Sequence, residues 1–178
     1  MNAPVLIESD RLRFSRPHID DATPILERYS SDPLVTRYLG WPRHQSIADA
    51  ETFIALSDDE WARAGYGPYL VSLRTTNDLI GGTGLHRRDE REAETGYVFA
   101  RDAWGRGYAT EALRTMLLVA AQIGIDRIIA TCHADHRASA RVLEKCGFVI
   151  DREVPDQSFP NLPTPTALAY LYVRTRSC

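Results

Sequence analysis

The chain has 178 residues, 44% of them hydrophobic and 25% charged, and this composition is typical of a globular protein with a single core. The formal net charge is −3, so the chain lacks the excess of Lys and Arg that binds nucleic acid or an anionic membrane nonspecifically. We therefore expect one domain over residues 1–178, with neither nucleic acid nor a membrane among its partners.

The cysteine content and the N-terminal segment both indicate a reducing compartment. There are three cysteines, Cys132, Cys146 and Cys178, and an odd number at wide spacing does not predict a disulfide framework. The segment around Glu8 and Asp10 has no apolar stretch like that of a signal peptide. No apolar run approaches the ~20 residues that span a bilayer. We therefore expect a cytoplasmic protein.

Hydrophobic periodicity and turn residues predict the elements of the first half. Polar and apolar side chains alternate through Leu12 and Phe14, which is typical of a strand, and Ser46 is suited to cap a long helix. In chain order we expect a strand at 11–16, helices at 20–30 and 46–64, and strands at 69–73, 79–86 and 94–100, the last three forming an antiparallel meander.

The second half has the pattern of strand–helix–strand crossovers. Apolar residues recur at i, i+3 and i+4 from 107 to 123, as in an amphipathic helix, and Gly124 is placed to end it. A Pro-rich loop precedes the final strand. The two halves together predict an α+β fold. The expected elements here are helices at 107–123 and 136–145 and strands at 127–131, 148–154 and 167–173.

The junction between the strand at 94–100 and the helix at 107–123 carries the strongest chemical signal. Gly105 and Gly107 let the backbone approach a ligand closely, and the helix N-terminus presents unpaired N–H groups. Arg106 adds a positive charge, so the segment favours a pyrophosphate. The Rossmann pattern fails because Thr110 stands where it needs a glycine, and no Gly-Lys-Ser/Thr follows as in a P-loop. Taken alone, the segment is either an anion site or a tight turn that only redirects the chain.

The segment from Trp104 to Ala112 resembles motif A of the GNAT N-acetyltransferases. In that motif, Gln/Arg-x-x-Gly-x-Gly/Ala, the small positions are Gly107 and Ala109. Trp104 stands at the Gln/Arg position, as in the RimJ/RimL-like branch (ribosomal-protein N-terminal acetyltransferases). Further segments that resemble this branch, in the same order along the chain, lie at 10–13, 32–39, 81–86, 94–99 and 139–148.

The resemblance implies a fold and a ligand. The fold is a mixed, mostly antiparallel sheet of about seven strands flanked by about four helices, with a V-shaped splay between the fourth strand (94–100) and the fifth (127–132). The ligand is acetyl-CoA as co-substrate, with no metal. Its pantetheine arm lies in the V and pairs with backbone groups of Tyr97, Val98 and Phe99. The residues implied to hold the pyrophosphate are Trp104, Gly105, Arg106, Gly107, Tyr108, Ala109 and Thr110.

The implied activity is transfer of an acetyl group to a primary amine by direct attack in a ternary complex. The amine belongs to a protein N-terminus or a small molecule, and a base must remove one of its protons. Glu94 is our first candidate for the base, and His86 is the second. The alternative for Glu94 is an edge carboxylate paired with an arginine, and the alternative for His86 is an exposed residue at a strand end.

Ser139 is the candidate acid that protonates the leaving thiolate. Many relatives use a tyrosine at the position of Leu143, which cannot donate a proton, whereas RimJ/RimL-like members carry a serine at the position of Ser139. Three residues earlier, His136 replaces an asparagine that contacts the pantetheine, and it could supply one N–H in its place. The alternative for Ser139 is a first-turn helix residue that bonds the backbone.

The sequence is also compatible with other functions. The sequence does not identify the acceptor amine. Three aromatic residues of the N-terminal half could line an acceptor pocket or belong to the core: Tyr38, Trp41 and Trp61. A non-catalytic acyl-CoA-binding protein on the same fold would keep the turn but lose the base and acid, and a nucleotide-binding protein is a more distant option. A metal at Cys132, His133 and His136 lacks a second ligand pair. The Pro-rich loop and the final strand could pair across a homodimer.

Overall fold

The computed structural model describes residues 2–155, 157–163 and 166–174. Its strands form an eight-stranded sheet in the order β1-β2-β3-β4-β5-β6-β8-β7. Neighbouring strands are antiparallel except β5 and β6, which run parallel. The strands are β1 (Leu6–Glu8), β2 (Leu12–Ser15), β3 (Pro68–Leu73), β4 (Leu79–Arg87), β5 (Glu92–Phe99), β6 (Arg127–His133), β7 (Val149–Val154) and β8 (Ala167–Val173).

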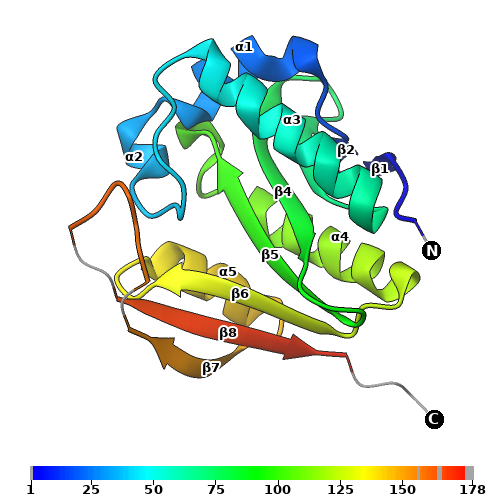
Figure 1. Cartoon of the computed structure of the whole chain (residues 1–178), viewed down its shortest axis with the longest axis vertical. Helices are drawn as coiled ribbons and strands as arrows, with labels where there is room; N and C mark the ends of the chain where they lie inside the picture. The colour runs from blue at the N-terminus through cyan, green and yellow to red at the C-terminus, as the bar shows by residue number, and fades with distance from the viewer. Residues whose placement is uncertain (1, 156, 164–165, 175–178) are drawn as a thin grey trace.

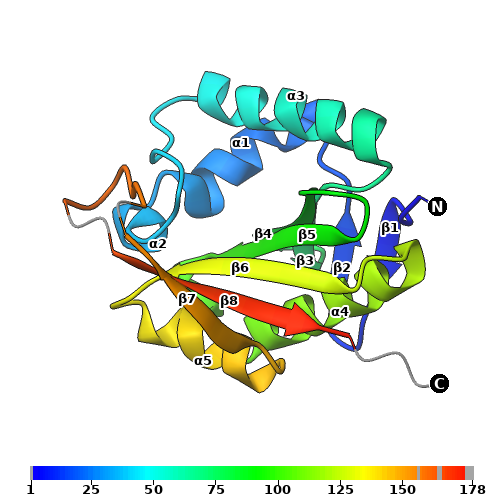
Figure 2. The same cartoon turned by 60° about the horizontal axis from the view of Figure 1, so that its bottom comes forward.

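Helices cover both faces of the sheet (Figures 1 and 2). Helices α1 and α3 lie on one face, and α4 and α5 lie on the other. A large core cluster includes Leu113 and Met116 of α4, and a second cluster includes Ile54 of α3 and Leu70 of β3. The central strands of the sheet are therefore covered on both faces, as their apolar residues require, whereas the edge strand β7 is largely exposed. The helices are α1 (Ala22–Ile25), α2 (Pro33–Thr36), α3 (Ile47–Ala64), α4 (Tyr108–Ile123) and α5 (Arg137–Lys145).

The predicted helix signals are confirmed at both long helices. Ser46 is the N-cap of α3 with extended backbone, and the carboxylate of Asp49 accepts a hydrogen bond from its amide at 2.9 Å. Such a cap satisfies an amide that has no partner within the helix. Gly124 ends α4 in the left-handed conformation, with φ of 86°. Both ends follow from local hydrogen bonding, so sequence alone can locate them.

Two expectations about the elements need correction. The described residues form eight strands rather than about seven, because the three residues of β1 pair with β2 as a short hairpin. The helix expected at 20–30 divides into a 3-10 turn, α1 and a π-helical turn at Leu26–Ser30, where the Ser31 amide donates to the Leu26 carbonyl at 3.3 Å. The expectation of about four helices agrees with the five α-helices of the described residues, of which α1 and α2 are single turns that periodicity does not reveal.

Several boundaries also differ by a few residues. Strand β5 begins at Glu92, two residues before its expected start, and β6 continues to His133. His136 is the N-cap of α5 rather than its first residue. Cys178 and part of the Pro-rich loop lie outside the described residues. In the part of the chain that is described, no helix is both long and apolar enough to cross a membrane.

Candidate active site

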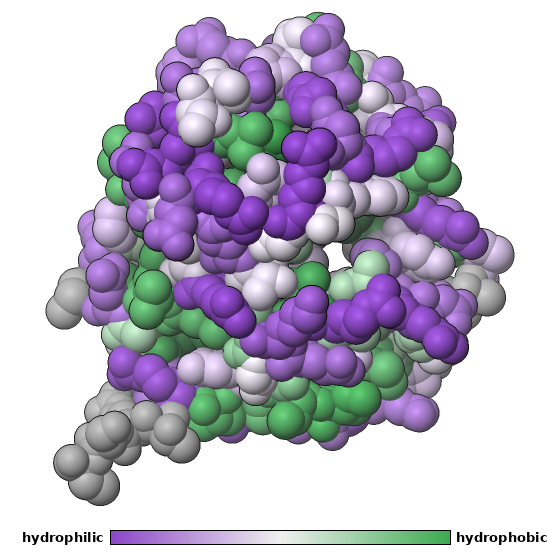
Figure 3. All heavy atoms as spheres, turned by 180° about the vertical axis from the view of Figure 1, so that it is seen from behind, coloured by the Kyte–Doolittle hydropathy of each residue, from purple (hydrophilic) through white to green (hydrophobic). Residues whose placement is uncertain are grey.

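The parallel pairing between β5 and β6 is short. Cα partners run only from Glu92 and Arg127 to Glu94 and Ile129, although β5 continues to Phe99 and β6 to His133. Beyond these pairs the two ribbons run apart in Figure 1. Figure 3, which shows the molecule from behind, has an opening in the surface between the half that holds β5 and the half that holds β6. Backbone groups on the facing edges are thus accessible to a ligand.

The segment from Trp104 to Gly107, called the glycine turn below, lies between the end of β5 and the start of α4. Gly105 and Gly107 both have positive φ, 73° and 79°, which a residue with a side chain adopts only with strain. The indole of Trp104 donates to the Phe99 carbonyl at 2.7 Å and so fastens the turn to the end of β5. Trp104, which stands at the usual Gln or Arg position, therefore also holds the turn in place against β5.

The first turn of α4 leaves its amides without partners. The first helical hydrogen bond runs from the Glu111 amide to the Gly107 carbonyl at 3.1 Å. Among the described residues, nothing accepts from the amides of Tyr108, Ala109 or Thr110. These three N–H groups and the positive end of the helix dipole therefore remain available to an anion.

Alternation along β5 places the predicted base and acid on opposite faces of the sheet. Val98 packs in the cluster that includes Ile54 of α3, so Glu94, four residues earlier, points to that face as well. Tyr97 points to the other face and contacts Ser139 of α5.

Glu94 lies in a small group of charged residues. It forms an ion pair with Arg88, and its side chain is 28% exposed, so the alternative of an arginine-paired carboxylate matches the geometry. His86 is its direct partner across β4 and β5. The Nδ1 atom of His86 lies 2.7 Å from Oε2 of Glu60, a residue of α3. His86 is therefore an exposed residue near the end of β4, as its alternative states, and its ring is oriented by a carboxylate.

Sequence reasoning missed Glu60. The side chain of this glutamate is 13% exposed, which is unusual for an unpaired carboxylate. Ser57 and Trp61 are buried on the sheet side of α3. Because Glu60 is three residues from one and adjacent to the other, helical spacing could have placed it near the sheet. No residue spacing relates Glu60 to His86, because the contact joins a helix to a strand 26 residues away.

The hydroxyl of Ser139 is paired with a tyrosine. The Tyr97 hydroxyl donates to the Ser139 carbonyl at 3.0 Å, and it lies 2.9 Å from Ser139 Oγ. Burial raises the pKa of Tyr97 above its ordinary value, so the phenol keeps its proton at neutral pH. With that proton on the carbonyl, Ser139 can donate its own proton to the phenol oxygen. The expected role of Tyr97 concerned its backbone alone, and the tertiary structure adds the side chain.

His136 lies in an aromatic cluster at the start of α5. Its ring stacks on Tyr38 with centroids 4.5 Å apart, and Tyr38 also contacts His133 at 5.2 Å. Burial, with a smaller contribution from His133, lowers the pKa of His136 to about 4. The imidazole is therefore neutral at pH 7 and keeps one N–H donor. Phe159 of the β7–β8 loop packs against His133 at 4.9 Å.

The aromatic residues of the N-terminal half separate into two kinds. Trp61 is 6% exposed and donates from its indole to the Pro68 carbonyl at 2.9 Å, so it belongs to the core. Tyr38 instead contacts the two histidines near α5. The loop that carries Trp41 is held against the β7–β8 loop by the side chain of Asn161. Its Nδ2 atom donates to the carbonyls of Thr36 and Trp41 at 2.8 and 2.9 Å.

In the described ranges, no group of three His, Cys, Asp or Glu side chains is placed to hold a metal ion. Cys132 is buried, and its thiol contacts the His136 carbonyl at 3.6 Å. Burial raises the pKa of the Cys132 thiol, which keeps it protonated at neutral pH.

Comparison with known proteins identifies the family. The family model for the acetyltransferase (GNAT) domain matches residues 11–149. The chain belongs to the GNAT acetyltransferase family. It is accordingly an acetyl-CoA-dependent N-acetyltransferase, and the predicted fold and family are confirmed. The matched segment contains β4, β5, the glycine turn and α5.

Similar proteins support the same assignment. The uncharacterized N-acetyltransferase YoaA of Bacillus subtilis is 34% identical over 151 residues, which cover 80% of this chain and 82% of YoaA. A GNAT-family acetyltransferase from Bacillus anthracis is 25% identical, with a TM-score of 0.80 over 94% of this chain and 98% of that one. RimL, a ribosomal-protein acetyltransferase solved with coenzyme A, is 18% identical and shares the fold, with a TM-score of 0.84 over 96% of this chain and 97% of RimL.

Proposed function

We propose that this GNAT enzyme transfers the acetyl group of acetyl-CoA to a primary amine by direct attack within a ternary complex. One observation carries the proposal. The opening between β5 and β6 has unpaired helix amides at one end, and it is flanked by Glu94 and His86 on one face and by Ser139 on the other. Such an arrangement places two substrates against each other, which is a large source of rate acceleration.

The donor is proposed to lie along the open edge of β5. Its pyrophosphate accepts hydrogen bonds from Tyr108, Ala109 and Thr110, beside the charge of Arg106. The amides of Tyr97 and Phe99 then pair with the pantetheine as an added strand would. Val98 is left out of this role, because its carbonyl points at β4, 2.2 Å from where a Cβ on Gly81 would lie. RimL, solved with coenzyme A, supports a ligand of this kind.

The acceptor amine is proposed to enter on the α3 face. A neutral amine attacks the thioester carbon, and the C–N bond forms as the C–S bond breaks. Glu94 or the Glu60–His86 pair accepts the proton that the nitrogen loses. With Nδ1–H donated to Glu60, Nε2 of His86 has a free lone pair, so the pair is organised as a base.

The leaving thiolate is proposed to take its proton on the opposite face. Ser139 donates its proton to the thiolate, the adjacent Tyr97 hydroxyl passes its own proton to the Ser139 alkoxide, and water then reprotonates the Tyr97 phenolate. The neutral His136 supplies an N–H to the pantetheine in place of the usual asparagine. No covalent acyl-enzyme is formed, so the two substrates must be bound together.

A screen of amine acceptors with acetyl-CoA tests the proposal. Protein N-terminal peptides, amino sugars and simple amines are each incubated with enzyme and acetyl-CoA, and free thiol release and product mass are measured. We expect at least one acceptor to be acetylated with sequential kinetics. Tight acetyl-CoA binding by calorimetry without transfer to any amine would instead support the non-catalytic acyl-CoA-binding alternative, and ping-pong kinetics would contradict direct attack.

A further inference from the structure

Arg11, which lies between β1 and β2 and far from the turn in sequence, contacts the glycine turn at several points. Its NH1 atom donates to the Arg106 carbonyl at 2.9 Å. Its guanidinium carbon lies 4.7 Å from the centre of the Tyr108 ring. A Cβ added to Gly107 would lie 3.6 Å from its NH2 atom. One side chain thus spans three consecutive residues, from the glycine turn to the first residue of α4.

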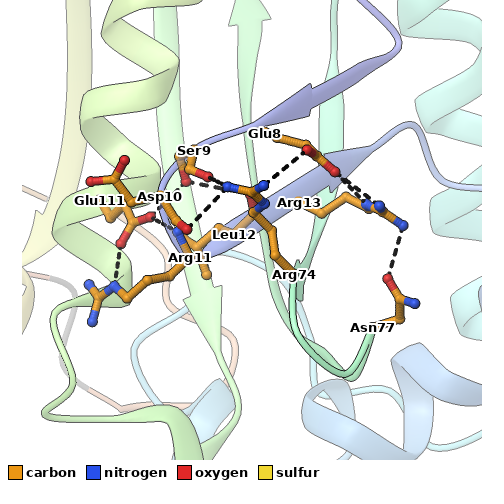
Figure 4. Close-up of polar contacts among 9 residues, drawn as sticks. All are labelled: Glu8, Ser9, Asp10, Arg11, Leu12, Arg13, Arg74, Asn77 and Glu111. Carbon is orange, nitrogen blue, oxygen red and sulfur yellow. Dashed lines mark hydrogen bonds and ion pairs between the residues drawn. The ribbon is translucent and has the colours of Figure 1, made fainter.

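The carboxylate of Glu111, in the first turn of α4, holds Arg11 in this position (Figure 4). Nε of Arg11 donates to Oε2 of Glu111 at 2.7 Å, and the Arg11 amide donates to Oε1 at 2.8 Å. The Ser9 hydroxyl donates to the same Oε1 atom at 2.7 Å. Burial alone would raise the pKa of Glu111, but these hydrogen bonds and the arginine charge outweigh it and keep the pKa below its ordinary value. The carboxylate is therefore ionised and fixed at neutral pH.

These contacts determine the direction of one peptide group. The carbonyl and the N–H of a trans peptide point in opposite directions. Because Arg11 fixes the Arg106 carbonyl, the amide of Gly107 must point to the opposite side of the turn. Gly107 itself does not resist a rotation of this peptide, since glycine adopts both signs of φ. Without Arg11, the peptide can turn its carbonyl oxygen towards the space where its N–H now points.

We propose that Arg11, anchored by Glu111, is a positioning residue that orients the glycine turn for the pyrophosphate of acetyl-CoA. The inference rests on the proposed binding of that pyrophosphate at the turn. It also explains why an acid can lie in the first turn of a helix that receives a polyanion. The charge of Glu111 is neutralised by Arg11, and the carboxylate serves as the anchor.

Substitution of Arg11 tests the proposal with two acetyl donors, acetyl-CoA and acetyl-pantetheine. In Arg11→Gln we expect the calorimetric Kd for CoA and the KM for acetyl-CoA to rise about tenfold, with kcat nearly unchanged. Arg11→Lys should show the same loss, because an ammonium cannot hold Glu111 and the Arg106 carbonyl in one planar group. With acetyl-pantetheine, which has no pyrophosphate, kcat/KM should equal that of the wild type in both variants.

The variant Glu111→Ala separates positioning from simple electrostatics. Removal of a negative charge beside the turn would by itself strengthen binding of a polyanion. Positioning predicts the reverse, a rise of about fivefold to tenfold in Kd for CoA. Arg13→Gln is the matched control, because Arg13 lies two residues further along and binds Glu8 and Asn77 rather than the turn. Its Kd for CoA should not change.

The outcomes distinguish this inference from the proposed function. If the wild-type enzyme fails to bind CoA, both are wrong. If the wild type binds CoA and Arg11→Gln binds it equally well, only the positioning role is wrong. A parallel loss with acetyl-pantetheine would reveal general damage and also overturn it, as would tighter binding by Glu111→Ala.

Discussion

The two ends of the opening between β5 and β6 are held by different kinds of contact. At the phosphate end, which comprises the glycine turn and the first turn of α4, an arginine that is 49% exposed ties the turn to the β1–β2 hairpin through charged hydrogen bonds. At the chemical end, which comprises Tyr97, Ser139 and His136, the contacts are uncharged and largely buried. The glycine turn is thus organised by ion pairs and the group of Tyr97, Ser139 and His136 by burial, while Glu94 and His86 on the α3 face have ion pairs of their own.

The difference follows from what each end is proposed to do. Binding of a pyrophosphate depends on the direction of backbone amides, and direction can be fixed by a charged side chain that remains in contact with water. Proton transfer depends on which groups carry protons, and burial sets this by disfavouring charged forms. Mutations at the phosphate end should therefore change the affinity for acetyl-CoA, and those at the chemical end should change turnover.

The largest expected effect on turnover comes from substitution of Glu94, on the α3 face of the sheet. Glu94→Gln should lower kcat about 100-fold, because removal of a general base commonly costs 10²–10⁴ in rate. The affinity for acetyl-CoA should remain near that of the wild type. Glu92→Gln is the control, since Glu92 lies on the same face of β5 and pairs with Arg127. Steady-state kinetics from pH 6 to 9 would measure both, and an unchanged kcat across this range would exclude Glu94 as the base.

A smaller effect is expected from Gly107→Ala at the phosphate end. The left-handed backbone costs a residue with a Cβ about 1–2 kcal/mol, and relief of that strain rotates the amides of the turn. We expect about a tenfold weaker Kd for CoA. Gly124→Ala introduces the same strain at the other end of α4, where φ is 86°, and should lower Tm without weakening CoA binding. Equal CoA affinity in the two variants would contradict the role of the turn.

The pH dependence of stability reports on His136. Its pKa is about 4 in the folded protein and about 6.5 when unfolded, so the unfolded state binds more protons between these values. Stability should therefore fall as the pH drops from about 6.5 to 4, by about 1 kcal/mol at pH 5 for this partly exposed ring. Urea unfolding at pH 7 and pH 5 measures the change. In His136→Asn the change should be smaller, and an identical pH dependence would refute the assignment.

The smallest expected effect is that of Tyr97→Phe. The ring remains, but Ser139 loses the hydroxyl that restores its proton, so kcat should fall about threefold with unchanged KM for acetyl-CoA. Tyr69→Phe removes another buried phenol, one that donates to the Pro4 carbonyl at 2.6 Å, and should affect Tm alone. A wild-type kcat in Tyr97→Phe would limit Tyr97 to a packing role.

Local signals predicted much of the fold and the phosphate end. Ser46, Gly124 and the apolar spacing of α4 act within one turn of helix, so their meaning does not depend on distant residues. The same holds for Gly105 and Gly107, whose conformations the turn requires. The hairpin of β1 was missed because three residues carry too little pattern, and Glu60 was missed because a helix–strand contact has no sequence spacing.

The sequence by itself determined the family, the order of the elements and the place of the glycine turn, because each depends on residues that are neighbours along the chain. Only the tertiary structure decided which side chains meet. It paired Glu60 with His86, Tyr97 with Ser139, and Arg11 with Glu111, which is 100 residues away. Such pairs form when strands and helices pack face to face, and their energies depend on burial and geometry that no local pattern encodes.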